Sequence, residues 1–303
     1  MLFKKKDTLP QDPVFIVGYP RSGTTLLQRL LMTQPGVDSL PETHYFCVIE
    51  KKIEFGRKGR ILPASLNLVW ESLYDKMEFR FSDEDIKKIT RLSVRKKLTS
   101  KDLFEFIVFE FMRRSRKTEG EETSYRWIEK TPVHYNYIDR IIEFYPRAQI
   151  LHIVRHPVPA VFSRKLKFPF NKETPLETLA ERWGRMVKVI ESFCLRFPDR
   201  IHTLRYEDLL SDMREELEKI AGFLKFDLDR SLIADFSRTA QSIILPSEAW
   251  KLDEPEEGFV NTNDVYKGVI ARKDARAVEA IVEREMRIYG YRPYFDDVEQ
   301  VPG

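Results

Sequence analysis

One joint, at residues 13–29, constrains the fold of this chain more than any other stretch. Val14–Val17 is a short run of β-branched and aromatic residues, too short for a helix, and it predicts a buried strand. After a turn bounded by Gly18 and Gly23, leucines recur at the spacing of one buried helical face. A strand that enters a helix through such a turn directs backbone N–H groups at one point, where they favour an anion.

The turn also carries side chains that suit a phosphate-like group. It holds three hydroxyl donors and one cation, namely Ser22, Thr24, Thr25 and Arg21. The glycine spacing fits the first half of the Walker A pattern, G-x-x-x-x-G-K-[ST], but Thr24 stands where the lysine belongs. A kinase or NTPase without that lysine lacks its main contact to the β and γ phosphates. We therefore expect a phosphate-bearing ligand other than a nucleoside triphosphate.

The sequence Tyr-Pro-Arg-Ser-Gly-Thr-Thr at residues 19–25 resembles the 5′-phosphosulfate loop of sulfotransferases that use 3′-phosphoadenosine 5′-phosphosulfate (PAPS). A second match follows the apolar run 150–154, where Arg155 is succeeded eight positions later by Ser163. In that family an arginine at a strand end and a serine at this spacing hold the 3′-phosphate. Arginine gives a phosphate two parallel donors, and the serine adds a hydroxyl. The resemblance implies that the 19–25 loop and this pair bind the two ends of PAPS.

Two shorter stretches extend the resemblance. Residues 128–132 resemble the Glu-Lys-Thr-Pro stretch of carbohydrate sulfotransferases, which implies that Lys130 stabilises the bridging oxygen and the sulfuryl group. Residues 204–209 resemble the segment whose tyrosine packs on adenine, which implies that role for Tyr206. The C-terminal Arg-Lys-Gly loop of cytosolic members is not reproduced, and Tyr266–Gly268 is the nearest candidate.

A candidate general base lies in Pro41–Phe46, after the first crossover. Glycosaminoglycan and tyrosylprotein sulfotransferases carry an acceptor-deprotonating glutamate at a similar place, so the resemblance implies this role for Glu42. His44 is the alternative, because cytosolic members use histidine and its ordinary pKa is nearer neutral. Arg21 and Lys130 would stabilise charge on the transferring group. No metal is expected, because side-chain cations can take its part.

The order of elements predicts the fold class. Strands alternate with helices, which indicates an α/β fold with a P-loop-type parallel sheet flanked by helices. Residues from about 48 to 120 show helical periodicity and predict a helical insertion. Residues from about 245 to 268 predict a long loop that could act as a lid. We find no repeat or dividing linker, so we predict a single sulfotransferase domain over residues 1–303.

Composition excludes several classes of protein. With 42% hydrophobic and 33% charged residues, the chain has the composition of a soluble globular protein. A net charge of +3 does not suggest nucleic acid, because positive charge supplies most non-specific affinity there. No run of eighteen apolar residues occurs, so no membrane span is expected. Residues 1–7 lack the apolar core of a signal peptide, and we expect a cytoplasmic enzyme or an excised catalytic domain.

The expected reaction is in-line transfer of a sulfuryl group from PAPS to a hydroxyl, with an acidic or histidine base. The acceptor stays open among a sugar, a peptide, a lipid and a carrier-bound chain. A nucleotide kinase of P-loop topology is one alternative, but it needs a lysine after Gly23 and an aspartate for Mg²⁺. A non-catalytic module that binds a bisphosphonucleotide is the other, and it predicts that changes at Glu42 and Lys130 have no effect.

Overall fold

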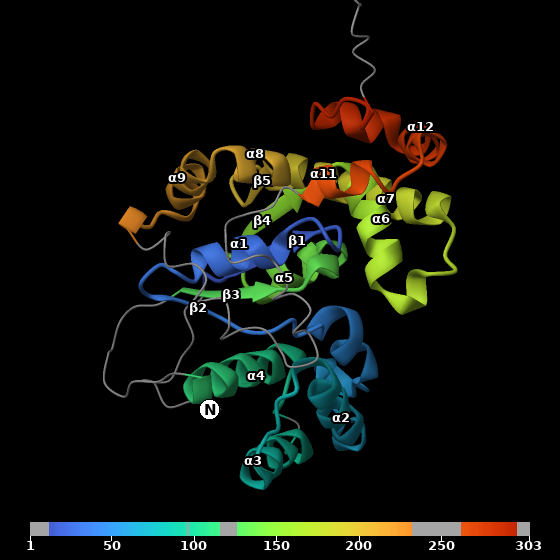
Figure 1. Cartoon of the computed structure of the whole chain (residues 1–303). Helices are drawn as coiled ribbons and strands as arrows, with labels where there is room; N and C mark the ends of the chain where they lie inside the picture. Colours follow the sequence, from blue (N-terminus) through green and yellow to red (C-terminus); the bar gives the residue numbers. More distant parts are fainter. Residues whose placement is uncertain (1–11, 96, 116–125, 232–261, 296–303) are drawn as a thin grey trace, which may run out of the picture. The chain divides into compact units, whose positions relative to one another are not determined.

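The structure is a computed structural model that describes residues 12–95, 97–115, 126–231 and 262–295. Within these ranges it contains a five-stranded parallel sheet with strand order β2-β3-β1-β4-β5 (Figure 1). The strands are β1 (Val14–Gly18), β2 (Val37–Ser39), β3 (Arg126–Lys130), β4 (Gln149–Val154) and β5 (Ile201–Arg205). The predicted α/β class, a parallel sheet flanked by helices, is confirmed.

The chain divides into two compact units. The first unit comprises residues 1–16, 27–150 and 229–253, and the second comprises residues 17–26, 151–228 and 254–303. Strands β2 and β3 lie in the first unit and β5 in the second, while the boundary crosses β1 after Ile16 and β4 after Ile150. Each group of candidate residues described below belongs to one unit.

In the first unit, helices follow β2 where the sequence predicts an insertion. They are α2 (Leu66–Met77), α3 (Asp83–Val94) and α4 (Ser100–Ser115), and α5 (Ile138–Phe144) follows β3. Phe104 of α4 packs against Phe15 of β1 and Trp127 of β3, with ring centroids 6.5 and 6.1 Å apart, and all three rings are fully buried. These aromatic contacts join α4 to the sheet, because large rings bury much apolar surface.

Helix α1 (Thr24–Leu31) begins at the predicted loop. Its first three residues belong to the second unit, and the rest belong to the first. The second unit also contains α6 (Pro157–Lys167), α7 (Leu176–Arg196), α8 (Tyr206–Ser211), α9 (Met213–Leu224), α11 (Thr262–Lys267) and α12 (Arg272–Ile288). Helix α12 lies along α7 (Figure 1), and a Cβ on Gly184 of α7 would approach the Val282 side chain of α12 to 3.1 Å. The glycine therefore permits the close approach of the two helices.

Several predictions concern parts of the chain that lie outside the described residues. The predicted lid loop at about 245–268 is outside them up to residue 261, and residues 262–267 form α11. A single domain over residues 1–303 stays a prediction. None of the helices in the described ranges is both long and apolar enough to cross a membrane.

Candidate active site

The loop between β1 and α1 has the backbone that its glycines predict. Arg21 and Gly23 both have left-handed backbones, with φ of 77° and 92°. A Cβ on Gly23 would lie 2.5 Å from the ring of Tyr206, and a Cβ on Gly18 would lie 2.4 Å from the carbonyl oxygen of Ile153. Contacts this close, together with the left-handed backbone of Gly23, disfavour any larger residue at the two positions, so both glycines suit the loop.

Ser22 gives this loop an unsatisfied polar group. Its side chain is fully buried, and its Oγ has no hydrogen-bond partner among the residues that the structure describes. An unpaired buried hydroxyl costs about 1–3 kcal/mol. Thr24 and Thr25 follow in the first turn of α1, where backbone N–H groups lack intrahelical partners. The loop therefore has the donors that an anionic group would satisfy.

Arg21, Arg155 and Ser163 come together in the second unit, although 134 to 142 positions separate Arg21 from the other two. Arg21 Nε donates to Ser163 Oγ at 3.1 Å, and Arg155 Nη1 donates to the carbonyl oxygen of Arg21 at 3.0 Å. Arg155 directly follows β4, Ser163 lies on α6, and both are buried. The structure thus joins the two phosphate signals of the sequence into one cationic cluster.

The orientation of Arg155 is fixed by further contacts within the second unit. Its guanidinium lies over the ring of Tyr206, 4.7 Å from the centroid, and its Nε donates to Asn263 Oδ1 at 2.7 Å. Asn263 Nδ2 in turn donates to Glu207 Oε1 at 3.0 Å, and the hydroxyl of Tyr291 donates to Glu207 Oε2 at 2.8 Å. Tyr206 therefore supports the guanidinium, and a polar chain through Asn263 holds it in place.

Sequence reasoning missed Asn263 and Glu207. The nearest sequence candidate for a closing contact was Tyr266–Gly268, three positions further along the same segment. Lys267 in that stretch is exposed, whereas Asn263 is buried. A single asparagine in a polar segment carries no sequence signal of its own, so only the fold reveals it.

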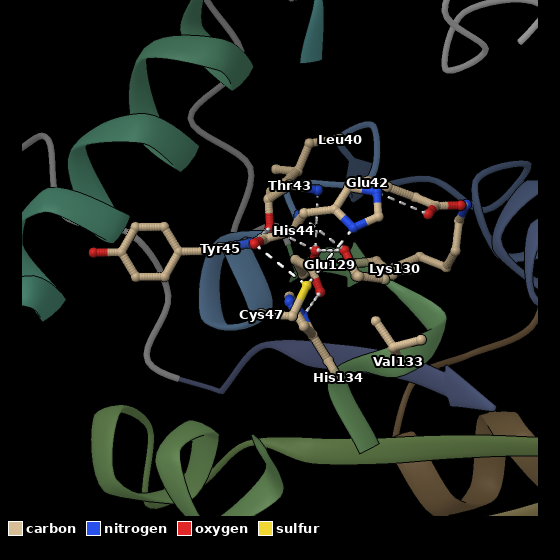
Figure 2. Close-up of polar contacts among 12 residues, drawn as sticks. Leu40, Glu42, Thr43, His44, Tyr45, Cys47, Glu129, Lys130, Val133 and His134 are labelled. Carbon is tan, nitrogen blue, oxygen red and sulfur yellow. Dashed lines mark hydrogen bonds and ion pairs between the residues drawn. The ribbon is translucent and has the colours of Figure 1, made fainter. Parts of the chain in front are cut away.

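In the first unit, Glu42 and Lys130 form an ion pair (Figure 2). Lys130 Nζ donates to Glu42 Oε1 at 2.6 Å, and the side chains are only 3% and 15% exposed. Lys130 is the last residue of β3 and pairs in register with Ile16, two residues before the end of β1. The predicted base and the predicted cation of the transfer step thus contact each other at the carboxyl ends of these strands.

His44 lies on the other side of the Glu42 carboxylate. Its Nε2 is 3.3 Å from Glu42 Oε2, and its Nδ1 is 3.7 Å from the sulfur of Cys47. Burial lowers the pKa of His44, but hydrogen bonds with Cys47 and Glu42 outweigh burial and raise the pKa to about 9. His44 is therefore an imidazolium at neutral pH, with no lone pair to accept a proton.

Sequence reasoning also missed Glu129, although it lies within the quoted 128–132 stretch. Its carboxylate is fully buried and accepts hydrogen bonds from the side chains of Thr43, Thr131 and His134 (Figure 2). An acid inside a predicted strand was the available signal, because such a group requires partners if the strand is buried. Over the described ranges, no group of three or more His, Cys, Asp or Glu side chains could hold a metal ion.

The five-stranded parallel sheet flanked by helices, with its glycine-bounded loop after β1, defines a protein of the α/β class. The sequence pattern of the sulfotransferase family matches residues 13–230, which is more than half of the chain. The chain belongs to the sulfotransferase family.

The curated relatives share about a quarter of their aligned residues with this chain, and each is longer than the matched region. The nodulation protein NoeE of Sinorhizobium fredii is 26% identical over 232 residues, covering 70% of this chain and 50% of NoeE. The omega-hydroxy-beta-dihydromenaquinone-9 sulfotransferase Stf3 of Mycobacterium tuberculosis is 26% identical, with 62% of Stf3 covered. The protein-tyrosine sulfotransferase of Drosophila melanogaster is 23% identical, with 37% covered. The match thus spans at most about three fifths of these relatives.

Two solved structures share the fold over nearly all of both chains. The sulfotransferase domain from the curacin biosynthetic pathway has a TM-score of 0.62 at 18% identity and covers 94% of this chain and 99% of that one. The sulfotransferase domain of the Synechococcus PCC 7002 olefin synthase has a TM-score of 0.58 at 21% identity, with coverage of 94% and 96%. At these identities the similarity shows the fold alone.

Proposed function

We propose that this chain transfers a sulfuryl group from PAPS to a hydroxyl-bearing acceptor. The contact of Arg21, Arg155 and Ser163 in one cluster carries the proposal, because two guanidinium groups and a hydroxyl suit a doubly phosphorylated nucleotide. The buried, unpartnered Ser22 hydroxyl supports it, since an anionic donor would supply the missing partner. Membership of the sulfotransferase family supports it independently.

In this proposal the residues of the second unit hold the donor. Ser22, Gly23, Thr24 and Thr25 bind the 5′-phosphosulfate together with Arg21. Arg155 and Ser163 bind the 3′-phosphate, and Tyr206 contacts the adenine. The polar chain through Asn263 keeps the Arg155 guanidinium in one orientation before the nucleotide arrives, which lowers the entropic cost of binding.

In the proposed reaction Glu42 accepts the proton of the acceptor hydroxyl. The acceptor oxygen forms a bond to sulfur while the bond from sulfur to the 5′-phosphate oxygen breaks, so 3′-phosphoadenosine 5′-phosphate (PAP) departs with the electron pair. Lys130 and Arg21 offset the negative charge that develops on the bridging oxygen and the sulfuryl group. Glu42 is preferred over His44 as base, because the imidazolium form of His44 carries a proton already.

The acceptor class follows from the family only in outline. The names of two relatives specify a protein tyrosine and a hydroxylated menaquinone as acceptors, and both present a hydroxyl oxygen. We therefore propose a sugar, peptide, lipid or carrier-bound hydroxyl for this chain. We further propose that it works in the cytoplasm as one sulfotransferase domain and without a metal.

The test is incubation with ³⁵S-labelled PAPS and a panel of hydroxyl acceptors. We expect Glu42→Gln and Lys130→Met to lower kcat by about 10²–10³-fold, the range found when a base or a charge-stabilising donor is removed. Both variants should bind PAP as the wild type does in calorimetry. Glu143→Gln, a change at an exposed carboxylate of the first unit, is the matched control and should keep full activity.

Other outcomes favour the alternatives. Tight PAP binding with no transfer to any acceptor, and no effect of either variant, would indicate the non-catalytic binding module. Hydrolysis or transfer of the γ-phosphate of ATP would indicate the nucleotide kinase. No detectable binding of PAPS or PAP would refute the proposed function.

A further inference from the structure

The backbone ladder between β2 and β3 stops just before the candidate base. The two strands pair in parallel through Ser39 and Ile128, and Pro41 follows two residues later. Proline has no N–H to donate, so it cannot extend the ladder. Nevertheless, residues 42–44 contact the end of β3, and each of these contacts has a side chain as at least one partner. The alignment of the two segments therefore depends on those side chains.

Glu129 makes the largest number of these contacts. Its Oε1 accepts hydrogen bonds from the Thr43 hydroxyl at 2.7 Å and from the Thr43 backbone N–H at 3.3 Å. The same oxygen accepts from the Thr131 hydroxyl at 2.7 Å, while Oε2 accepts from His134 Nδ1 at 2.9 Å. The Glu129 carboxylate thus binds one sequence neighbour of each member of the ion pair. Thr43 follows Glu42, and Thr131 follows Lys130.

The Thr131 hydroxyl adds a second connection. While it donates to Glu129, it accepts a hydrogen bond from the backbone N–H of His44 at 3.2 Å. His44 in turn contacts the Glu42 carboxylate. The backbone that directly follows Glu42 is therefore held by the end of β3, at Thr43 and at His44.

Glu129 is charged in this setting. Burial raises its pKa, but the charge and hydrogen bond of His134 and the two threonine hydroxyls outweigh burial and lower the pKa. Hydrogen bonds to an ionised acceptor are stronger and more directional than neutral ones. Consecutive strand residues point to opposite faces, so fixing Glu129 on one face directs Lys130 to the other.

We propose that Glu129, Thr43 and Thr131 form a positioning cluster that replaces the missing backbone ladder and holds Glu42 and Lys130 at their contact distance of 2.6 Å. The cluster makes no contact with the reacting atoms in this proposal, so its members are positioning residues. The inference rests on the proposed function, because it assigns the ion pair to sulfuryl transfer. Its geometric part can be measured without any turnover.

The test removes the side-chain hydroxyl of Thr43 or Thr131 with valine and keeps it, in matched variants, with serine. We expect Thr43→Val and Thr131→Val to lower kcat by about 10–100-fold, since small displacements of reacting groups can cost this much. The KM for PAPS and the affinity for PAP should stay within about twofold of wild type, because only the transfer step is impaired. Thr43→Ser and Thr131→Ser keep the hydroxyl and should restore most of kcat.

Ser93→Ala is the matched control. Ser93 is a buried hydroxyl of the first unit that donates to the carbonyl oxygen of Ile61 at 2.7 Å, so its removal costs a similar hydrogen bond elsewhere. We expect Ser93→Ala to lower the midpoint of thermal unfolding without changing kcat. The comparison separates loss of position from loss of stability.

A second readout needs no activity. NMR titration of the His44 ring should give a pKa near 9 in the wild type and in Ser93→Ala, and a value closer to 6.5 in Thr131→Val, because the ring loses its alignment with Glu42. An unchanged kcat in both valine variants, or a serine variant as impaired as its valine counterpart, would overturn the inference. If the wild type transfers no sulfuryl group at all, the proposed function is refuted. The positioning cluster is tested separately, because an unchanged His44 pKa in Thr131→Val would refute it without any measurement of activity.

Discussion

At the scale of single residues, Arg155 shows how several neighbours can hold one side chain in a single orientation. Its Nε, its Nη1 and the flat face of its guanidinium each have a partner, in Asn263, Arg21 and Tyr206. Its backbone oxygen also accepts a hydrogen bond from the buried Trp183 indole at 3.0 Å. A planar fork held at several points loses little entropy on binding a phosphate.

We expect Arg155→Ala to weaken PAP binding by about 2–3 kcal/mol, or roughly 30- to 140-fold, the usual loss for a charged hydrogen-bonded pair. Arg155→Lys should recover little of this, because an ammonium cannot reproduce the planar fork. Isothermal titration calorimetry measures both. Arg185→Ala, at an exposed cation of α7, is the control, and equal losses in Arg155→Ala and Arg185→Ala would contradict a specific role.

At the scale of elements, helix α11 links the C-terminal part of the second unit to Arg155. Asn263 on this helix is 8% exposed and bridges Arg155 and Glu207. The sequence instead pointed to Tyr266–Gly268 at the end of the same helix. If Asn263 makes the important contact, its loss should weaken nucleotide binding more than the loss of Lys267, and the opposite holds for Tyr266–Gly268.

We expect Asn263→Ala to weaken PAP binding by about 1–1.5 kcal/mol, because Arg155 loses a hydrogen bond that orients it. Asn263→Asp should weaken it further, since a carboxylate would replace the amide that donates to Glu207. Lys267→Ala should have less effect than either. Calorimetry with PAP decides, and a larger loss in Lys267→Ala than in Asn263→Ala would favour the sequence assignment.

Elements set by local pattern were predicted closely. Helix α7 spans Leu176–Arg196 and lies between Pro175 and Pro198, and α6 begins at Pro157, where proline suits a first turn. β2 ends at Ser39, and Tyr45–Ile49 forms a π-helical turn after His44, whose φ is 49°. Such a turn depends on tertiary contacts and has no periodic signal.

At the scale of the whole molecule, stability should depend on two histidines with opposite shifts. The pKa of His44 is raised from 6.5 to about 9, whereas burial lowers the pKa of His152 to about 3. The contribution of His44 is fully present below pH 6.5 and is lost as pH rises through 9. The contribution of His152 is present above pH 6.5 and is lost as pH falls toward 3, because only the unfolded chain takes up the proton.

We therefore expect the free energy of unfolding to be largest near neutral pH. In the wild type the free energy of unfolding should decline between pH 6.5 and pH 9.5. We expect His44→Gln to make this decline smaller by about 1–3 kcal/mol. Urea unfolding of wild type and variant across this range measures the difference between the two curves. Parallel curves from pH 6 to pH 10 would show that His44 keeps its ordinary pKa in the folded protein.

The sequence alone determined the strand–loop–helix joint and the order of strands and helices, because these follow from local periodicity and glycine placement. It also proposed Arg21, Glu42, Lys130, Arg155 and Ser163 as candidate residues, because their segments resemble sulfotransferase motifs. Only the tertiary structure decided which side chains surround them. Glu129 reaches Thr43 across 86 positions and Asn263 reaches Arg155 across 108, and no local pattern encodes such pairs. Hydrogen bonds between distant segments form only when packing of the strands and helices brings the groups within about 3 Å, so their partners are a property of the fold.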